Sequence, residues 1–334
     1  MSEISLEILN SNEICYKEID TLFSSASNET LFHHPKFLSY HANAKFPDAN
    51  WRHYLFREGS RLIGYLPGAL VMEDSGCIYK SPFASSFGGL VYGNLNFAQI
   101  DTCLEKWWHD LDQQNIQRAE VILAPLPYSS PNFCEGVEFK LNQLGFQLKA
   151  PELCLIVPID KHSEFPRQLF RNKDWRYLKQ GREKPGSIIY SQELNDIKRF
   201  YPVLLENRKK HGVLPTHSLE EIICLHELFP HALHLFLATV DENVVAGILA
   251  FQTNKRVLNA FYQASNEQGR KIRAMNFLCA EVYGWSLSQS IAWVDLGSSS
   301  FGLEAHKTLI NFKESCGGRK FLRKRYIWHR NNYS

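Results

Sequence analysis

Polar and ionisable side chains in the second half of the chain stand where predicted strands end. Asp295 closes the apolar run 291–297, and Ser298 begins the serine run that follows it. Tyr262 lies in another apolar run, 257–264. Because ligands of α/β sheets gather where strands end, these side chains are candidates for acid–base chemistry or for holding an amine. The alternatives are structural: Asp295 accepts from loop amides, and Tyr262 packs as an ordinary strand aromatic.

A loop held by a proline is a second candidate for binding. The pattern predicts a helix over 197–210, and Ser218 begins the next helix with a capping box. Thr216 and His217 follow Pro215 on the connecting loop. A loop fixed in this way can present side chains to a substrate, or it can be only a turn.

Basic residues gather in three stretches, although 37 Lys+Arg nearly balance 35 Asp+Glu. A formal charge of +2 gives no global field that would attract nucleic acid or a membrane. The three stretches are 160–186, the loop 265–273 with Arg270, Lys271 and Arg273, and the tail 319–330. Each would suit an anionic partner. The alternatives are a solvated helix face, a loop that binds nothing and a surface strand.

The remaining composition describes a globular chain for which we expect no metal. Its eight cysteines are scattered, with no C-x-x-C pair, and buried reduced thiols account for them. The cysteine and histidines of 224–234 lack a recognised ligand spacing. An acidic N-terminus and the lack of any apolar run of about 18 residues predict a cytoplasmic protein with no membrane span.

The elements that would position these residues recur in both halves. A chain of 334 residues is long for one core, which predicts two domains, 1–158 and 159–334. Each half gives a hairpin, a strand, a helix and a strand in that order. Gly64 and Gly247 follow the two hairpin turns with an offset of 247 − 64 = 183. The pattern therefore predicts a duplicated α/β fold, with mixed α+β sheets flanked by helices.

This order of elements resembles the N-acyltransferase fold known as GNAT. Two copies in tandem resemble the Fem-type aminoacyl-tRNA-dependent peptidyl transferases and the GNAT-like proteins of bacterial surface-polysaccharide gene clusters. The segments that carry the resemblance are 204–219, 245–247, 260–262, 275–278, 294–297 and 311–317. The first half resembles the family only in its pattern, so we expect a degenerate N-terminal domain and a C-terminal domain that carries the site.

The resemblance implies acyl transfer from an activated thioester or ester to an amine, with a splayed sheet admitting the donor. Backbone amides of 258–264 are the implied oxyanion donors. Lys313 matches the position of a Fem-type lysine and would stabilise charge on the donor's phosphate or on the oxyanion. As a bare pattern, Lys313 predicts an exposed strand residue. The implied catalytic set is Lys313, Tyr262 and Asp295, and the implied acceptor-binding set is Arg208, His211, Thr216, His217, Asn276 and Ser298.

The donor loop departs from the family pattern. In GNAT enzymes the pyrophosphate of coenzyme A sits on a glycine-containing loop at a helix N-terminus. Here Arg273 and Met275 stand where small residues are expected. Coenzyme A should therefore bind weakly, and Arg270, Lys271 and Arg273 would hold the donor's phosphates by side-chain contacts.

Three functions stay open at this point. The first is an N-acyltransferase that takes an acyl group from acyl-CoA or acyl-carrier protein to an amine of a small molecule, sugar or cell-surface precursor. The second is a Fem-type transferase using aminoacyl-tRNA, which makes tRNA a partner. The third is a catalytically silent GNAT-like binding module. No DNA partner is expected.

Overall fold

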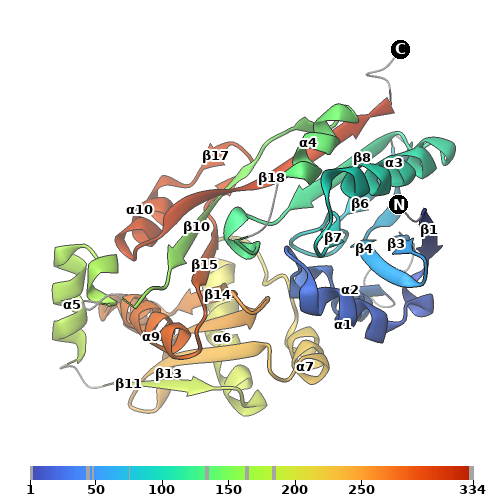
Figure 1. Ribbon diagram of the computed structural model, residues 1–334. Coiled ribbons are helices and arrows are strands. Elements are labelled where there is room, and N and C mark those ends of the chain that lie inside the picture. The colour runs from blue at the N-terminus through green and yellow to red at the C-terminus, as the bar shows by residue number, and fades with distance from the viewer. Residues whose placement is uncertain are drawn as a thin grey trace. The chain divides into compact units, whose positions relative to one another are not determined.

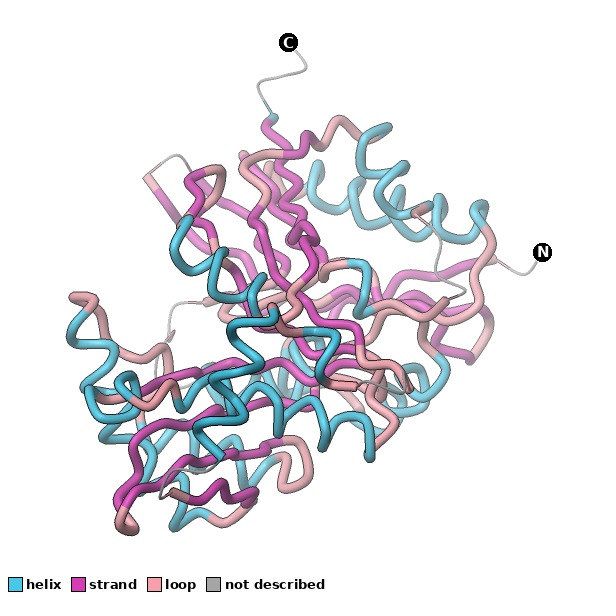
Figure 2. The backbone as a smooth tube through the Cα atoms, turned by 90° about the vertical axis from the view of Figure 1, so that its left-hand side faces the viewer, coloured by secondary structure: helices cyan, strands magenta, loops and turns pink. Residues whose placement is uncertain are grey.

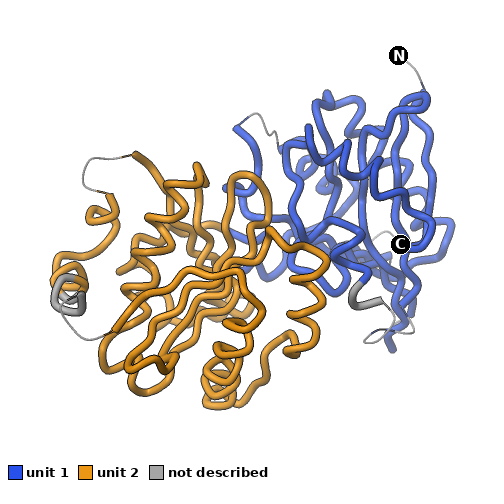
Figure 3. The backbone as a smooth tube through the Cα atoms, turned by 90° about the horizontal axis from the view of Figure 1, so that it is seen from below, with its two compact units in different colours: residues 1–152, 322–334 blue, residues 153–321 orange. Residues whose placement is uncertain are grey.

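The structure, a computed structural model, describes residues 3–42, 46, 49–74, 76–131, 135–161, 165–182 and 186–330. Contacts divide the chain into two compact units, shown in two colours in Figure 3. Unit 1 comprises 1–152 with 322–334, and unit 2 comprises 153–321. This division does not test whether each half folds alone, so the domains 1–158 and 159–334 remain a prediction.

Unit 1 is built from two sheets and the helices packed on them (Figure 1). Its helices are α1 (Tyr16–Ser25), α2 (Pro35–Ala42), α3 (Phe97–Gln113) and α4 (Gly136–Gln143). One sheet has the order β1 (Ile4–Leu9), β3 (His53–Glu58), β4 (Arg61–Leu66) and β7 (Val91–Tyr92). The other contains β18 (Arg319–His329), β8 (Arg118–Leu123), β6 (Gly76–Ser81), β5 (Ala69–Glu73) and β2 (Asn50–Trp51), with β9 (Gln147–Leu148) also on β18.

Unit 2 is one mixed sheet with helices on it, and its strands are the magenta layer between cyan helices in Figure 2. The strand order is β11 (Ser187–Ser191), β12 (Leu233–Val240), β13 (Asn243–Gln252), β14 (Val257–Ser265), β15 (Trp293–Ser298) and β10 (Glu152–Pro158). The helices are α5 (Asn172–Arg182), α6 (Leu194–Lys210), α7 (Leu219–Leu228), α8 (Glu267–Lys271), α9 (Ala274–Ser288) and α10 (Lys307–Ser315). A small hairpin, β16 (Ser300–Phe301) and β17 (Glu304–Ala305), precedes α10.

Helices cover both faces of the unit 2 sheet. Successive side chains of a strand point to opposite faces, so neighbouring residues of β13 show what covers each face. A Cβ added at Gly247 of β13 would lie 2.5 Å from the ring of Phe200, so this face meets α6. The neighbouring Ala246 and Ile248 point the other way and belong to a core formed with α9. Both faces of β13 are therefore buried, which explains its nearly continuous apolar sequence.

Unit 1 repeats this arrangement. Leu55 and Tyr65, which pair across β3 and β4, pack on α1, whereas the adjacent Phe56 lies in a separate core with Trp107 of α3. Both units thus share the order strand, two helices, hairpin, further strand structure, helix, strand and helix, with the three short strands β5, β6 and β7 of unit 1 where unit 2 has β14. The predicted tandem organisation is confirmed.

The predicted alignment of the two hairpins is wrong by one residue. The residues that follow the turns are Arg61 and Asn243, which gives an offset of 243 − 61 = 182. Both hairpins then have a bulge, after which Phe56 pairs with Gly64 and Ala238 pairs with Ala246. Gly64 and Ala246 thus occupy the same position of the two hairpins. Gly247 is one residue further along, and a shift of one residue moves a side chain to the other face of a strand. Two glycines near similar turns suggested a match that the register does not support.

Each half of the sequence ends in a strand that pairs within the sheet of the other unit. β10 follows the helices of the first half and pairs antiparallel with β15 of unit 2. β18 follows α10 and pairs antiparallel with β8 of unit 1 from Lys324 onward. The basic tail is therefore a strand, the structural alternative for this segment. Its bases meet carboxylates of unit 1 in the pairs Arg323–Glu152, Lys324–Glu138, Arg325–Glu120 and Arg330–Asp112.

No helix in the described part of the chain is long and apolar enough to cross a membrane. The predicted cytoplasmic location is not tested by this observation.

Candidate functional site

Two neighbouring strands of unit 2 separate, and the predicted site residues lie where they do so. β14 and β15 pair in parallel only from Val257–Trp293 to Asn259–Asp295, although both strands continue in fully described segments. A bulge against β13, placing two residues of β14 opposite Ala250, bends β14 at this point. The result is an open edge along the end of β15.

Asp295 stands at the last paired position and is buried, with 1% of its surface exposed. Its Oδ1 accepts from the backbone amide of Gly297 at 2.7 Å, and its Oδ2 accepts from Asn259 Nδ2 at 3.3 Å. The structural alternative for this carboxylate, an acceptor for a loop amide, is therefore realised. These contacts fix the turn at Gly297, whose φ of 83° favours glycine.

Lys313 reaches the same strand end from α10. The side chain is buried and its Nζ donates to the carbonyl oxygens of Gly297 and Ser298, both at 2.9 Å. Burial lowers the pKa of Lys313 from 10.5 to about 8, and the negative charge of Asp295 opposes this shift. The bare pattern predicted an exposed strand residue, which is wrong. Lys313 instead lies in α10, whose C-cap residue is Cys316, so its immediate neighbours indicated neither the helix nor the burial.

Tyr262 is buried on β14 and anchors the loop that follows α6. Its Oη accepts from the backbone amide of His217 at 2.9 Å and lies 2.7 Å from His217 Nδ1. The Thr216 side chain is also hydrogen-bonded to it, and burial raises the pKa of Tyr262. The predicted capping box of Ser218 is confirmed. The loop and the strand are therefore one hydrogen-bonded group.

The Tyr262 hydroxyl is used within the chain. Its oxygen accepts from the His217 amide and lies within hydrogen-bond distance of His217 Nδ1, and the Thr216 side chain is a further partner. With these partners Tyr262 holds the loop against β14.

Arg208 links this group to Lys313. Its guanidinium lies 5.9 Å from the centre of the Tyr262 ring. Burial is the main cause of the lowered pKa of Lys313, and the positive charge of Arg208 lowers it further. The structure thus brings together the residues Arg208, Thr216, His217, Tyr262, Asp295, Ser298 and Lys313.

For two further members of the predicted acceptor set the structure gives other surroundings. His211 is the exposed C-cap residue of α6. Asn276 is buried in the first turn of α9, where its Nδ2 lies 3.8 Å from Cys316 Sγ. Ser298 contributes its backbone carbonyl to Lys313, while its hydroxyl donates to the Ser300 carbonyl at 2.9 Å. Its predicted substrate role remains untested.

The three predicted donor-phosphate bases contact partners within the chain. Arg270 Nη1 donates to the Ser265 carbonyl at 3.0 Å, and Lys271 pairs with Glu267 at 2.9 Å. Arg273 is the N-cap residue of α9 with a φ of 53°, and its Nη1 lies 3.8 Å from Asp174 Oδ1. The segment expected to be a loop contains α8. Its amides donate internally: Arg270 to Asn266, Ile272 to Gln268 and Arg273 to Arg270.

Sequence reasoning missed three residues near these contacts. They are Asn259 and Gln263 on β14 and Asp174 on α5. Gln263 and Ser265 are two residues apart in the run 257–265, and this alternation was the available signal for a polar face. Asn259 lies before the bulge and pairs with Phe251, so it belongs to the other face. Asp174 gave no signal, because it lies among the bases of 160–186.

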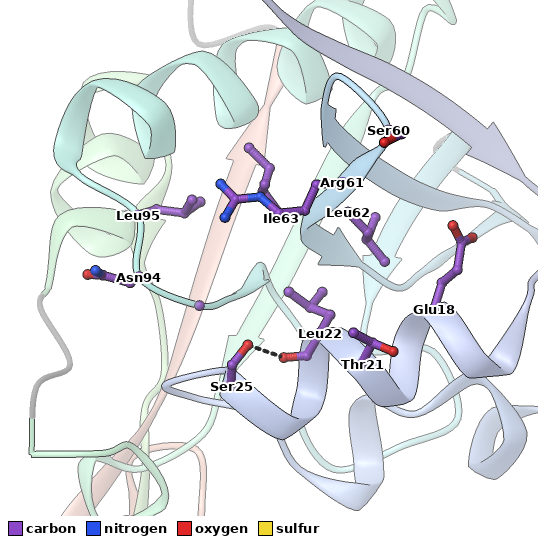
Figure 4. A pocket seen from close by; sticks show the side chains of 11 residues that line it. Glu18, Thr21, Leu22, Ser25, Ser60, Arg61, Leu62, Ile63, Asn94 and Leu95 are labelled. Atoms are coloured by element: carbon purple, nitrogen blue, oxygen red, sulfur yellow. Dashed lines mark hydrogen bonds between the residues drawn. The ribbon is translucent and has the colours of Figure 1, made fainter. Parts of the chain in front are cut away.

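Among the residues that the structure describes, no group of three or more His, Cys, Asp or Glu side chains could hold a metal ion. Unit 1 has a hollow of about 530 Å³ between α1, the start of β4 and residues 93–95 (Figure 4). Arg61 and Asn94 lie on its wall with apolar side chains such as Leu22 and Ile63. None of the predicted site residues lines this hollow.

No family model matches the sequence, and no curated protein matches it. Solved structures do match over almost the whole chain. FemX aligns with a TM-score of 0.72 at 12% identity, over 98% of both chains. A tandem GNAT protein from the clavulanic acid biosynthesis pathway aligns with a TM-score of 0.57 at 10% identity, also over 98% of both chains.

L-PGS from Bacillus licheniformis aligns with a TM-score of 0.57 at 12% identity, over 95% of this chain and 92% of that chain. At such identities the likeness concerns the fold. Together with the repeated element order and the separated strands β14 and β15, it shows that this chain has the tandem GNAT-like fold of the Fem type.

Proposed function

We propose that this chain is an acyltransferase that moves an acyl or aminoacyl group from an activated carrier to an amine of a small-molecule or cell-surface precursor. The observation that carries the proposal is Lys313, a buried cation with a pKa of about 8 at the open end of β15. A buried and perturbed ionisable group is costly to maintain, and such groups cluster at functional sites.

The reaction needs charge stabilisation at one atom. The amine attacks the acyl carbonyl, a carbon–nitrogen bond forms, and the carbonyl oxygen becomes an oxyanion. The oxyanion then collapses, the bond to the carrier's sulfur or oxygen breaks, and the proton that the amine loses leaves with that atom as a thiol or hydroxyl. Below pH 8, Lys313 carries three N–H groups, of which two are directed at Gly297 and Ser298. The third and the positive charge can stabilise the oxyanion or a phosphate of the donor.

The acceptor would bind beside the Tyr262 group. The loop of Thr216 and His217 is fixed there by the Tyr262 hydroxyl, and the guanidinium of Arg208 lies over the Tyr262 ring. We assign Tyr262 and Asp295 positioning roles, since the Tyr262 hydroxyl is hydrogen-bonded to His217 and Asp295 holds the turn at Gly297. Lys313 remains the catalytic residue of this proposal.

Aminoacyl-tRNA is the second candidate donor, which makes the chain a Fem-type transferase. The observation that favours it is the alignment with FemX over 98% of both chains. The contacts of Arg270, Lys271 and Arg273 within the chain bear equally on both donors, since coenzyme A and tRNA both carry phosphates.

The test is a transfer assay with three donors, acetyl-CoA, an acylated carrier protein and aminoacyl-tRNA. Small molecules that co-purify with the protein supply the acceptors, and mass spectrometry detects the acylated amine. We expect product with a carrier or tRNA donor and little with acetyl-CoA. A steep salt dependence of binding would identify tRNA. No product with any donor would favour the silent binding module and contradict the proposal.

A further inference from the structure

The end of β15 has backbone carbonyls that an adjoining strand would normally satisfy. Beyond Asp295 this edge no longer pairs with β14. Such an open edge accepts an extended chain that carries its own amides, which adds as another strand. Groups of the protein that already bond to these carbonyls therefore determine whether an extended molecule can bind along the edge of β15.

In this chain the edge is occupied by side chains. Gln263 Nε2 donates to the Leu296 carbonyl on β15 and to the Ala260 carbonyl on β14, both at 3.0 Å. It thus bridges the two strands at the point where they separate. Lys313 Nζ takes the next two carbonyls, Gly297 and Ser298. The last three carbonyls of β15 are all bonded to side-chain donors.

A second internal group lies at the first turn of α9. Asp174 pairs with Arg273, the N-cap residue of this helix, at 3.8 Å. Cys316, whose sulfur lies 3.8 Å from Asn276 in that turn, is near enough to Asp174 for the carboxylate charge to act on its thiol. The pKa of the Cys316 thiol is raised by its hydrogen bond to Cys279, by burial and, further, by the charge of Asp174.

Asp174 has two features of a group that occupies an anion site. Only 5% of its surface is exposed, and its buried Oδ2 has no hydrogen-bond partner among the described residues. A carboxylate beside a helix N-terminus is stabilised there as a phosphate would be. Its negative charge would repel a phosphate brought to the same turn.

We propose that Gln263 and Asp174 determine donor specificity in unit 2. Gln263 closes the edge of β15 to an extended, amide-bearing arm, and Asp174 keeps phosphates away from the first turn of α9. A donor that combines such an arm with a pyrophosphate, as coenzyme A does, is excluded at both places. The inference rests on the proposed function, because donor specificity matters only to a transferase. Its test is the affinity of the protein for acetyl-CoA, which does not require transfer activity.

Calorimetry with acetyl-CoA tests it on the full chain. The variants are Gln263→Ala, Asp174→Asn and the double variant. Gln192→Ala is the control for the first, since Gln192 Nε2 donates to a strand carbonyl, that of Leu233. Asp196→Asn is the control for the second, since Asp196 also pairs with an arginine, Arg199. Pantetheine and inorganic pyrophosphate serve as probes of the two halves of the donor.

We expect wild-type protein to bind acetyl-CoA weakly, each variant to bind it about tenfold more tightly and the double variant about a hundredfold. Pantetheine should gain affinity only from Gln263→Ala, and pyrophosphate only from Asp174→Asn. Tight binding by the wild type, or folded variants that bind no better than the controls, would overturn the proposal. Gln263→Ser replaces Gln263→Ala if the latter fails to fold. Gained binding without any transfer activity would count against the proposed function alone.

Discussion

Replacing Lys313 by methionine should change how the stability of the protein depends on pH. The folded pKa of Lys313 is about 8, against 10.5 for an ordinary lysine. Between these values the unfolded chain binds more protons than the folded one, so the free energy of unfolding rises with pH. A difference of about 2.5 in pKa corresponds to about 3 kcal/mol in total, of which about 2.5 kcal/mol falls between pH 7 and pH 10.

Urea denaturation at pH 7 and pH 10 measures this effect. The wild type should gain about 2.5 kcal/mol relative to Lys313→Met over this interval, because the variant has no proton to lose. At pH 7 the variant leaves two carbonyls without their donor, which costs on the order of 1–3 kcal/mol, but it also removes a buried charge. The two proteins should therefore be of similar stability at pH 7.

The control is Lys307→Met on the same helix, where the lysine is exposed. Its pH dependence should match that of the wild type. If Lys313→Met and wild type change in parallel between pH 7 and pH 10, Lys313 titrates as an ordinary lysine, and the reasoning about its burial is refuted.

Three further outcomes follow from the same contacts. Tyr262→Phe should cost about 1–3 kcal/mol of unfolding free energy in urea, because the buried amide and Nδ1 of His217 lose their partner; an unchanged midpoint would show that the loop is held in another way. In a transfer assay the rate of the wild type should fall above pH 8 as Lys313 loses its charge, and Lys313→Arg should not show this fall; a rate that keeps rising through pH 9 would instead make Lys313 a base. Gly247→Ala should cost about 1–3 kcal/mol of unfolding free energy, since its Cβ would lie 2.5 Å from an aromatic ring. Gly284→Ala, with open space around the added Cβ, should be neutral or stabilising. Equal effects of the two variants in thermal melting would contradict the packing described for β13.

The sequence predicted the elements of unit 2 closely, because their apolar runs are long and their ends have clear signals. The helix expected over 197–210 is α6, and the apolar run 257–264 is the strand β14. The capping box at Ser218 located the start of α7 to the residue. Such signals are local, and local patterns determine elements more directly than they determine contacts.

What the sequence could not show depends on register and on contacts distant along the chain. The hairpin register matches Gly64 with Ala246 and not with Gly247, because each hairpin contains a bulge. No feature of the composition marks such a bulge. The partners of Lys313 lie 15 and 16 residues away on a separate strand. The lysine's burial follows from those contacts, whereas its neighbours suggested an exposed position.

The central claim is that Lys313 acts at an acyl-transfer site, and a single-turnover transfer rate tests it most directly. With the donor found by mass spectrometry, the rate at pH 7 is compared for wild type, Lys313→Met and the control Lys307→Met. We predict a loss of at least about a hundredfold for Lys313→Met, the usual effect of removing one preorganised group that stabilises an oxyanion, and an unchanged rate for Lys307→Met. Equal rates for all three folded proteins would contradict the account.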